Sequence, residues 1–230
     1  MSPILLLGLF VLQRQWRAAA GVVGTVMGLM LIAWLGVGTQ NMLSFFTIGL
    51  GESTLSELGA NNNFAPLSRL HYFAQLWAFT GLEGVLRGLW VLCCLGALTL
   101  LSLRPHSPDS LAFKLLFSLW IAATLLISPV TWEGHLVMLL PAFAVCVAVL
   151  LEVEERRARW LGAWLALAYV GMAFDNWVYT HFGEWWRTTG SYVHDRFIGD
   201  LRLVSLMLFS ALLVVLLRVN RSGERQTSSR

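Results

Sequence analysis

The chain has 230 residues, of which 57% are hydrophobic and only 13% are charged, and its mean hydropathy is +0.68. Because a soluble domain carries roughly 25% charged residues, this composition excludes an ordinary soluble protein and indicates a membrane protein. The formal net charge is +3, with the basic residues mostly arginines in short clusters between apolar runs. We interpret these clusters as determinants of membrane topology and not as a nucleic-acid-binding surface.

Seven apolar segments follow one another and predict an all-α, polytopic bundle of transmembrane helices. The first is short, with about half of the roughly 20 residues that a spanning helix needs. The segments are residues 2–12, 18–37, 84–103, 111–127, 135–151, 160–174 and 201–217. They define a transmembrane helical domain over residues 1–217. The polar tail that follows, residues 218–230, is expected to be disordered and cytoplasmic.

The order of charges around the first segment argues against a secretory signal peptide. In a signal peptide, positive charge precedes the apolar stretch, whereas here Arg14 and Arg17 follow it. That order is typical of the cytoplasmic end of a transmembrane helix. We therefore hypothesise that residue 1 lies inside a helix that begins further upstream in a longer protein.

Basic residues also predict the orientation in the membrane. If the turn at residues 13–17 is cytoplasmic and the segments alternate, every cytoplasmic connection is short and basic, as the positive-inside rule expects. The cytoplasmic side then collects Arg14, Arg17, Arg104, Lys114, Arg156, Arg157, Arg159, Arg218, Arg221, Arg225 and Arg230. We expect a multi-pass protein of the plasma (inner) membrane with a cytoplasmic C-terminus. Its longer loops, 38–83, 129–134 and 175–200, would be extracytoplasmic, and loops carry function more often than their scaffold.

The first of these loops contains a polar turn followed by a short amphipathic stretch. The run Asn61–Asn63 favours a turn, and Phe64, Leu67 and Leu70 then repeat at helical spacing, which predicts a short interfacial helix. Arg69 and His71 lie on that stretch. An arginine with paired donors suits phosphate binding, although extension of its charge into lipid headgroups explains the same pattern.

The second loop is a tight turn between two membrane helices. Pro129 is expected to end the first helix, because the residue before proline avoids helical backbone. Thr131 is a plausible N-cap for the next helix.

Three side chains that follow Thr131, those of Trp132, Glu133 and His135, are predicted to lie at the bilayer edge. Glu133 and His135 have the chemistry of a base, a hydrogen-bond donor or a phosphate partner. A purely structural role for these residues explains the pattern equally well. Tryptophan favours membrane interfaces, and an acidic residue in a first helical turn interacts favourably with the helix dipole.

Other patterns favour structural interpretations. The third loop is rich in Trp, Tyr and acidic residues, which is typical of an interfacial aromatic belt and also of a sugar site. Glu83 and Arg87 are four residues apart and are expected to pair on one helix face. No HExxH or comparable metal-binding spacing is present, and no nucleotide-binding signature appears. We therefore expect neither a metal nor a soluble cofactor.

The turn at residues 128–135 and the helix after it resemble a recurrent motif of glycosyltransferase family 87, long catalogued as domain of unknown function 2029. The matching residues are Ser128, Pro129, Trp132, Glu133, His135 and Pro141, while Gly134 departs from the pattern. The first loop is similar to the family's Asn-Gln-Ser stretch that ends in Arg-Leu, with Asn61, Arg69 and Leu70 in matching positions. The resemblance covers nearly all of this chain and the C-terminal part of a full-length member.

This resemblance implies a membrane glycosyltransferase of the GT-C-like type that lacks its N-terminal part. The family uses polyprenyl-phosphate sugars, typically mannose, on the extracytoplasmic face. A hexose would pass from such a donor to a glycan or glycolipid acceptor. The catalytic acidic residue is expected in an outer loop upstream of this chain. That loop would belong to an N-terminal half, which would be the partner of this chain. The substrate-binding residues would be Asn61, Arg69, His71, Trp132, Glu133 and His135.

Two alternatives remain open at this point. The chain could be a non-catalytic membrane scaffold or a transporter-like subunit in cell-envelope glycan handling, since no acid in it matches the family's catalytic residue. It could also be a related polymerase or ligase that handles lipid-linked glycans with an outer loop.

Overall fold

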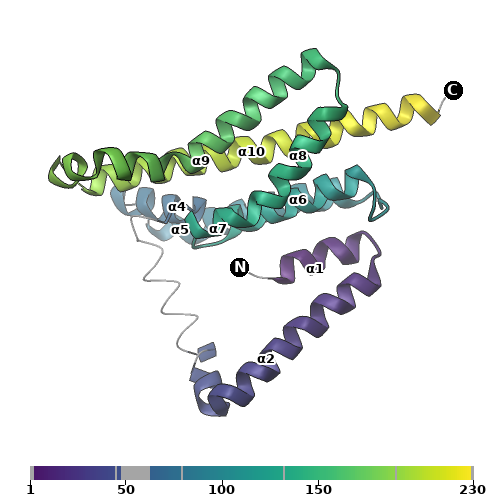
Figure 1. The fold of residues 1–230 in the computed structure, drawn as a ribbon. Coiled ribbons are helices and arrows are strands. Elements are labelled where there is room, and N and C mark those ends of the chain that lie inside the picture. Colours follow the sequence, from purple (N-terminus) through teal and green to yellow (C-terminus); the bar gives the residue numbers. More distant parts are fainter. Residues whose placement is uncertain are drawn as a thin grey trace.

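The computed structural model describes the backbone of residues 3–44, 46–47, 63–78, 80–131, 133–189 and 191–228; side chains are described for these residues except 3–4, 80, 133, 174–198 and 221–228. Within these ranges every element of secondary structure is helical (Figure 1). In chain order they are α1 (Pro3–Leu12), α2 (Trp16–Ser44), α4 (Pro66–Leu76), α5 (Thr80–Ser102), α6 (Leu111–Ile127), α7 (Glu133–Leu136), the 3₁₀ turn η2 (Val137–Leu139), α8 (Leu140–Glu152), α9 (Glu155–Thr189) and α10 (Ser191–Ser228).

The predicted helical membrane bundle is confirmed, and each of the seven apolar segments corresponds to a helix. Four stretches are long and apolar enough to cross a bilayer, namely Trp16–Ser44, Gly81–Ser102, Gly134–Glu152 and Gly199–Asn220. Helix α6 is a shorter apolar helix of 17 residues. The predicted short helix at the first loop also forms, as α4, with Pro66 in its first turn, where the missing N–H of proline costs nothing.

The expectation of a loop over residues 175–200 is wrong. Helix α9 continues to Thr189, and α10 begins at Ser191. The aromatic and polar run in this stretch contains no proline, so nothing in it removes a backbone donor or forbids helical dihedral angles. Helix α10 also includes residues 218–228, so the boundary placed after Leu217 does not coincide with a helix end. The disorder and cytoplasmic position of the tail stay predictions.

The turn after α6 differs in one detail from the expectation. Helix α6 ends at Ile127, before Ser128 and Pro129, as predicted. Helix α7, however, begins at Glu133, so Thr131 lies too early to be its N-cap. The Thr131 hydroxyl instead donates to the carbonyl oxygen of Leu125 at 2.9 Å. Thr131 therefore satisfies a carbonyl at the C-terminal end of α6, where the helix itself supplies no partner.

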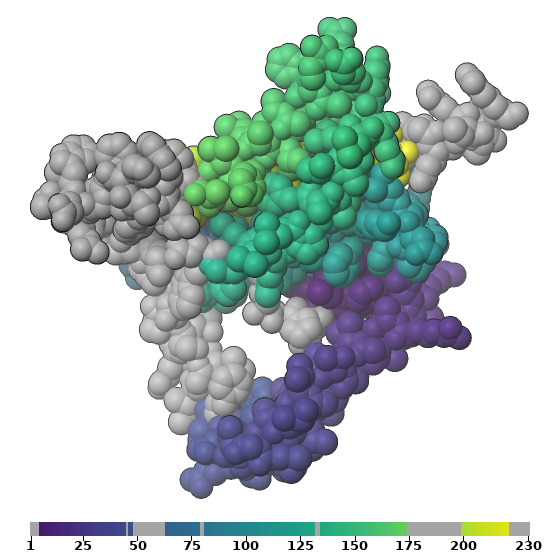
Figure 2. Space-filling model, in the orientation of Figure 1, coloured from purple at the N-terminus to yellow at the C-terminus, as the bar shows by residue number. Residues whose placement is uncertain are grey.

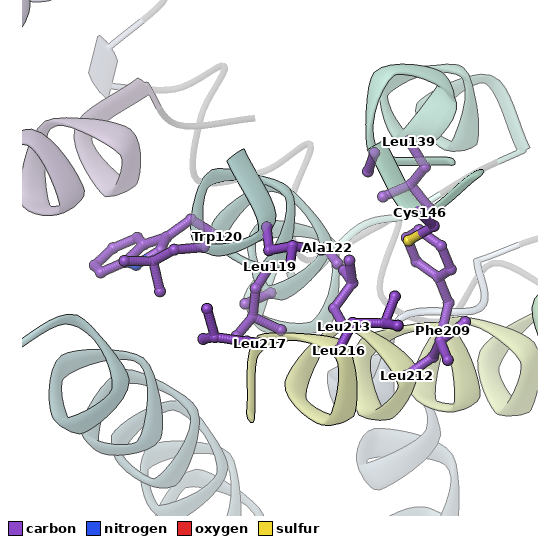
Figure 3. Close-up of a cluster of buried hydrophobic side chains, with 14 of the residues drawn as sticks. Leu119, Trp120, Ala122, Leu139, Cys146, Phe209, Leu212, Leu213, Leu216 and Leu217 are labelled. Carbon is purple, nitrogen blue, oxygen red and sulfur yellow. The ribbon is translucent and has the colours of Figure 1, made fainter. Parts of the chain in front are cut away.

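The core is centred on α6, which packs against α10 and α8. Figure 3 shows Leu213, Leu216 and Phe209 of α10 close to side chains of α6 and α8. Phe209 also stacks on Phe143 of α8, with ring centroids 4.2 Å apart. Because lipid is as apolar as leucine, this packing stabilises the bundle through close van der Waals contact.

Helices α9 and α10 approach closely at Gly171. A Cβ added at Gly171 would collide with the Ser205 hydroxyl and lie 3.1 Å from the Ser205 Cβ. The two small residues therefore allow the backbones to come together, as small residues do at membrane helix interfaces.

A buried glutamine in the α1–α2 turn is bonded to the last residue of α5 and to the α5–α6 connection, at one end of the bundle (Figure 1). The Gln13 amide nitrogen donates to the carbonyl oxygens of Ser102 at 2.7 Å and Arg104 at 3.1 Å. Its oxygen accepts from the His106 backbone N–H at 2.7 Å. Gln13 is 3% exposed. These bonds hold two of the basic connections side by side.

Helix α2 diverges from the rest of the bundle (Figure 2). None of its most apolar 18-residue window is buried inside the structure. The chain turns within this helix at Gly38, whose φ of 79° is left-handed backbone that glycine tolerates without strain.

Candidate functional site

Asn63 joins the two segments in which the sequence placed the candidate residues. Its amide nitrogen donates to the carbonyl oxygen of Pro129 at 3.0 Å. Its oxygen accepts from the backbone N–H groups of Thr131 and Ala65, both at 3.0 Å. The Phe64 N–H also donates to the carbonyl oxygen of Thr131 at 3.1 Å. The start of α4 is therefore docked against the turn that leads into α7.

Two of the Asn63 bonds, to the N–H groups of Ala65 and Thr131, are buried, and the bond to Pro129 is partly buried. Asn63, Phe64, Ala65 and Thr131 are all 0% exposed. A buried amide that makes three hydrogen bonds to backbone groups satisfies donors and acceptors that no helix or sheet would otherwise pair. This arrangement brings the N-terminal ends of α4 and α7 to the same end of the bundle.

Arg69 points inward and pairs with the N-terminal part of α10. Its Nε lies 2.6 Å from Oδ1 of Asp200, and the residue is only 7% exposed. Gly199 of α10 lies against the Arg69 guanidinium, and a Cβ there would require the guanidinium to shift. The interpretation that Arg69 extends into lipid headgroups is therefore wrong. Its charge is held at the junction of α4 and α10, with an exposed carboxylate as partner.

A second arginine, Arg202 of α10, reaches the same junction. The Arg202 guanidinium carbon lies 5.8 Å from the centroid of the Phe64 ring, and Arg202 is 5% exposed. A guanidinium over a ring face is attracted by the ring's negative quadrupole. The fully buried Phe64 therefore links α10 to the segment that Asn63 fixes.

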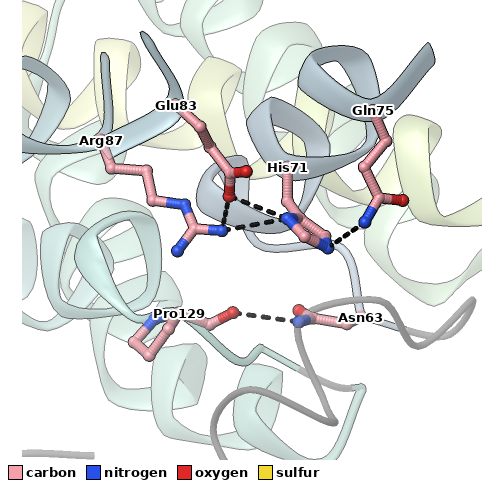
Figure 4. A network of polar contacts seen from close by, with 6 residues as sticks. All are labelled: Asn63, His71, Gln75, Glu83, Arg87 and Pro129. Carbon is pink, nitrogen blue, oxygen red and sulfur yellow. Dashed lines mark hydrogen bonds and ion pairs between the residues drawn. The ribbon is translucent and has the colours of Figure 1, made fainter. Parts of the chain in front are cut away.

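His71 lies beside Glu83 and Arg87, where α4 faces the start of α5 (Figure 4). Its Nδ1 is 2.8 Å from Oε1 of Glu83, and its Nε2 is 2.9 Å from the amide nitrogen of Gln75. The predicted pair between Glu83 and Arg87 is confirmed as an ion pair that uses the same carboxylate oxygen. One guanidinium nitrogen also lies 3.2 Å from His71 Nδ1.

The surroundings of His71 favour the neutral form of its imidazole. Burial, which disfavours the charged form, and then the Arg87 guanidinium lower the pKa of His71 below its ordinary value of 6.5. Glu83 would by itself favour the imidazolium form, but Arg87 pairs with the same carboxylate oxygen. Burial and the arginine therefore outweigh the attraction of the carboxylate.

The six residues selected from the sequence are only partly placed. Arg69 and His71 lie on α4, as described above. His135 lies on α7 and is half-buried. Asn61 and Trp132 lie outside the described residues, and Glu133 is described only by its backbone as the first residue of α7.

Sequence reasoning missed Asn63 and the meeting of His71 with Glu83 and Arg87. Asn63 belongs to the run of three asparagines that we interpreted as a turn, and no residue pattern distinguishes it from its neighbours. The Glu83–Arg87 pair was predicted from its spacing, but its proximity to a histidine 12 residues earlier depends on how α4 folds back on α5.

The chemistry available at this end is acid–base and electrostatic. The charged and histidine side chains that the structure describes at this end are Arg69, Arg87, Arg202, Glu83, Asp200, His71 and His135. Among the described residues, no group of three His, Cys, Asp or Glu side chains has an arrangement that would hold a metal ion. The expectation that no metal or soluble cofactor takes part stays a prediction.

Apolar helices long enough to span a bilayer, with a polar, arginine-containing cluster at one end, define an integral membrane protein. The model of glycosyltransferase family 87 matches residues 1–129, more than half of the 230-residue chain. The chain belongs to this family and is a membrane glycosyltransferase by family. The match contains Asn63, Arg69, His71 and Glu83 and ends before His135, so it is shorter than the nearly complete coverage expected from the sequence. No curated protein and no solved structure matches the chain.

Proposed function

We propose that this protein takes part in the transfer of a hexose, with mannose the first candidate, from a polyprenyl-phosphate sugar to a glycan or glycolipid acceptor on the extracytoplasmic face of the plasma (inner) membrane. The observation that carries the proposal is the docking of residues 63–65 on residues 129–131 through Asn63. This contact brings α4, which carries Arg69 and His71, and α7, which carries His135, to the same end of the bundle. The chain belongs to glycosyltransferase family 87.

A lipid-linked donor fits this end of the bundle. The polyprenyl tail would lie among the apolar helices and its phosphate at the membrane boundary, where Arg69 and His135 would stabilise the charge that develops on the leaving phosphate. Arginine suits that role because its planar fork matches phosphate oxygens. Asp200 is the more exposed partner in the Arg69 pair, so a phosphate would meet Arg69 beside a carboxylate that is free to turn away.

The proposed sidedness has support from the bonds of Gln13. They hold the Arg14-bearing turn next to the connection that contains Arg104, at the opposite end of α5 from Glu83. Collection of basic connections at one end is what the positive-inside rule expects of the cytoplasmic side. The Asn63 end would then be extracytoplasmic.

The proposal is tested with membranes that carry the protein expressed from its full native reading frame. Labelled polyprenyl-phosphate mannose is supplied, and transfer to lipid-extractable or glycan acceptors is measured. We expect Arg69→Ala and His135→Ala to reduce transfer by about 100-fold, the loss typical for removal of one group that stabilises developing charge. Unchanged transfer in both variants would contradict the assignment of the site.

Asp200→Asn is the matched control for Arg69→Ala. Both substitutions remove the Arg69–Asp200 ion pair, but Asp200→Asn keeps the arginine. If Arg69 acts on phosphate, transfer survives in Asp200→Asn and is lost in Arg69→Ala. Equal loss in both variants would show that only the ion pair matters and would contradict phosphate binding. A substrate gradient across vesicles without any covalent product would favour the transporter-like alternative.

A further inference from the structure

Two basic segments are held side by side at the end of α5 that lies opposite Glu83. The start of α2 and the turn before it carry Arg14 and Arg17, and the α5–α6 connection carries Arg104. Gln13, the residue before Arg14, donates to the carbonyl oxygen of Arg104 itself at 3.1 Å. The backbone positions that bear Arg14 and Arg104 are therefore fixed next to each other.

These arginines meet little negative charge within the protein. Arg14, Arg17 and Arg104 are exposed, and none of them forms an ion pair within the described part of the chain. Residues 13–17 and 103–114 contain a single carboxylate, that of the exposed Asp109, and Lys114 adds a further positive charge. Such an excess of positive charge on one surface attracts an anionic partner.

The backbone of Arg14 adopts a conformation that favours glycine. Helix α1 ends in a Schellman motif, in which the Gln15 N–H donates to the Phe10 carbonyl oxygen at 2.8 Å and the Arg14 N–H to that of Val11 at 3.0 Å. Arg14 has a φ of 57°, in the left-handed region, which residues with a Cβ adopt at a cost. Helix termination alone would favour glycine, so the presence of arginine indicates that its exposed guanidinium has a role.

Apolar surface next to these arginines is open to lipid. Trp16, between Arg14 and Arg17, is 63% exposed. Further along the same helix, Val23 and Met27 are exposed as well, and Figure 2 shows α2 diverging from the rest of the bundle. Guanidinium groups above a tryptophan and an apolar helix surface match the profile of a phospholipid, which has a charged headgroup above acyl chains.

We propose that the surface formed by Arg14, Arg17, Arg104 and Trp16 binds the phosphate headgroup of an anionic phospholipid, whose acyl chains lie along α2. The paired donors of arginine match phosphate oxygens, and basic clusters next to a membrane helix bind anionic lipids. This headgroup site lies at the opposite end of α5 from the His71 cluster. It does not depend on the transfer reaction.

The first test measures lipid binding to the purified full chain in an uncharged detergent. Dioleoylphosphatidylglycerol or dioleoylphosphatidylcholine is added, and bound lipid is counted by native mass spectrometry. We expect at least about 10-fold tighter binding of the anionic lipid. Replacement of Arg14, Arg17 and Arg104 together by glutamine should weaken that binding on the order of 100-fold, or about 5-fold for each arginine. Equal affinity of the wild-type protein for the two lipids would overturn the proposal.

The matched control removes the same charge from another basic segment. Replacement of Arg156, Arg157 and Arg159 by glutamine neutralises three exposed arginines at the start of α9. Figure 1 shows this helix start well away from the α1–α2 turn, with α6 between them. Affinity for the anionic lipid should stay within about 3-fold of wild type, because charges beyond about 8 Å are screened at physiological ionic strength. Equal losses in the two triple variants would show general charge attraction and overturn the site.

A single substitution separates lipid binding from folding. Arg14→Gly removes the guanidinium but suits the left-handed backbone. The lipid-free variant should therefore resist SDS-induced unfolding at least as well as wild type, while its affinity for dioleoylphosphatidylglycerol falls by about 5-fold. Unchanged affinity in Arg14→Gly would contradict the role of this arginine. Displacement of the bound lipid by an equal concentration of glycerol 3-phosphate would show a site for a soluble phosphate and would overturn the assignment to a phospholipid.

Discussion

Replacement of Asn63 by alanine is expected to destabilise the protein more than most single substitutions. The change removes one donor and one acceptor that together serve the Pro129 carbonyl and the N–H groups of Ala65 and Thr131. Each buried group left without a partner costs about 1–3 kcal/mol. Because water that enters the vacated space would satisfy some of the three groups, we expect a net loss of about 3–5 kcal/mol in the free energy of unfolding.

The assay is reversible unfolding by SDS in mixed micelles, followed by far-UV circular dichroism and tryptophan fluorescence. Asn41→Ala is the matched control, since exposed Asn41 makes one bond, to the Val37 carbonyl oxygen of its own helix at 2.8 Å. That substitution should change stability by less than about 0.5 kcal/mol. Asn63→Asp should be at least as destabilising as Asn63→Ala at neutral pH, because it buries a carboxylate with one oxygen facing the Pro129 carbonyl.

One result would contradict this role of Asn63. If Asn63→Ala unfolds within about 0.5 kcal/mol of wild type, then Asn63 does not hold the start of α4 against the turn before α7. The candidate site would lose the contact that assembles it. A large loss in the control variant would instead show that the assay reports on the asparagine substitution itself and not on the buried bonds.

Three further predictions concern other parts of the molecule. Gly171→Ala should cost about 1–3 kcal/mol by overpacking because its new Cβ would meet Ser205; adding Ser205→Gly should restore most of the loss, and additive effects in the double variant would refute the contact. Gln13→Ala should cost about 2–4 kcal/mol, since it leaves the Ser102 and Arg104 carbonyls and the His106 N–H unpaired; a thermal unfolding midpoint equal to that of wild type would contradict it. As the pH falls below the ordinary value of 6.5, the unfolded chain takes up a proton at His71 before the folded protein does, so stability should fall between that pH and the lower folded-state pKa. His71→Asn should remove this part of the pH dependence, and an unchanged pH profile in that variant would count against the lowered pKa.

The membrane class and the helices were predictable because bilayer constraints act on short windows of sequence. A spanning segment must be apolar and must satisfy its own backbone, so apolar runs such as residues 111–127 and 201–217 could be recognised without knowledge of their neighbours. Pro129 marked the end of α6 for an equally local reason. The spacing of Glu83 and Arg87 predicted their ion pair, because residues four apart on a helix are adjacent.

Predictions that depended on what a side chain meets across the bundle were less successful. Thr131 looked like an N-cap, but its hydroxyl bonds back to α6. The aromatic stretch at residues 175–200 looked like a loop, because interfacial composition does not distinguish a loop from the end of a long helix. Arg69 looked free to reach lipid headgroups, whereas the proximity of α10 gives it Asp200 as a partner.

The sequence by itself determined that this protein is a helical membrane protein and placed its polar residues near the ends of those helices. The tertiary structure decided which of these residues meet: Asn63 with the turn after α6, Arg69 with α10, and His71 with Glu83 and Arg87. The division has a physical cause. The bilayer requires each spanning segment to be apolar and helical, and this requirement can be read from a short stretch of sequence. A hydrogen bond or ion pair between distant residues depends on how those helices pack, which no short stretch of sequence records.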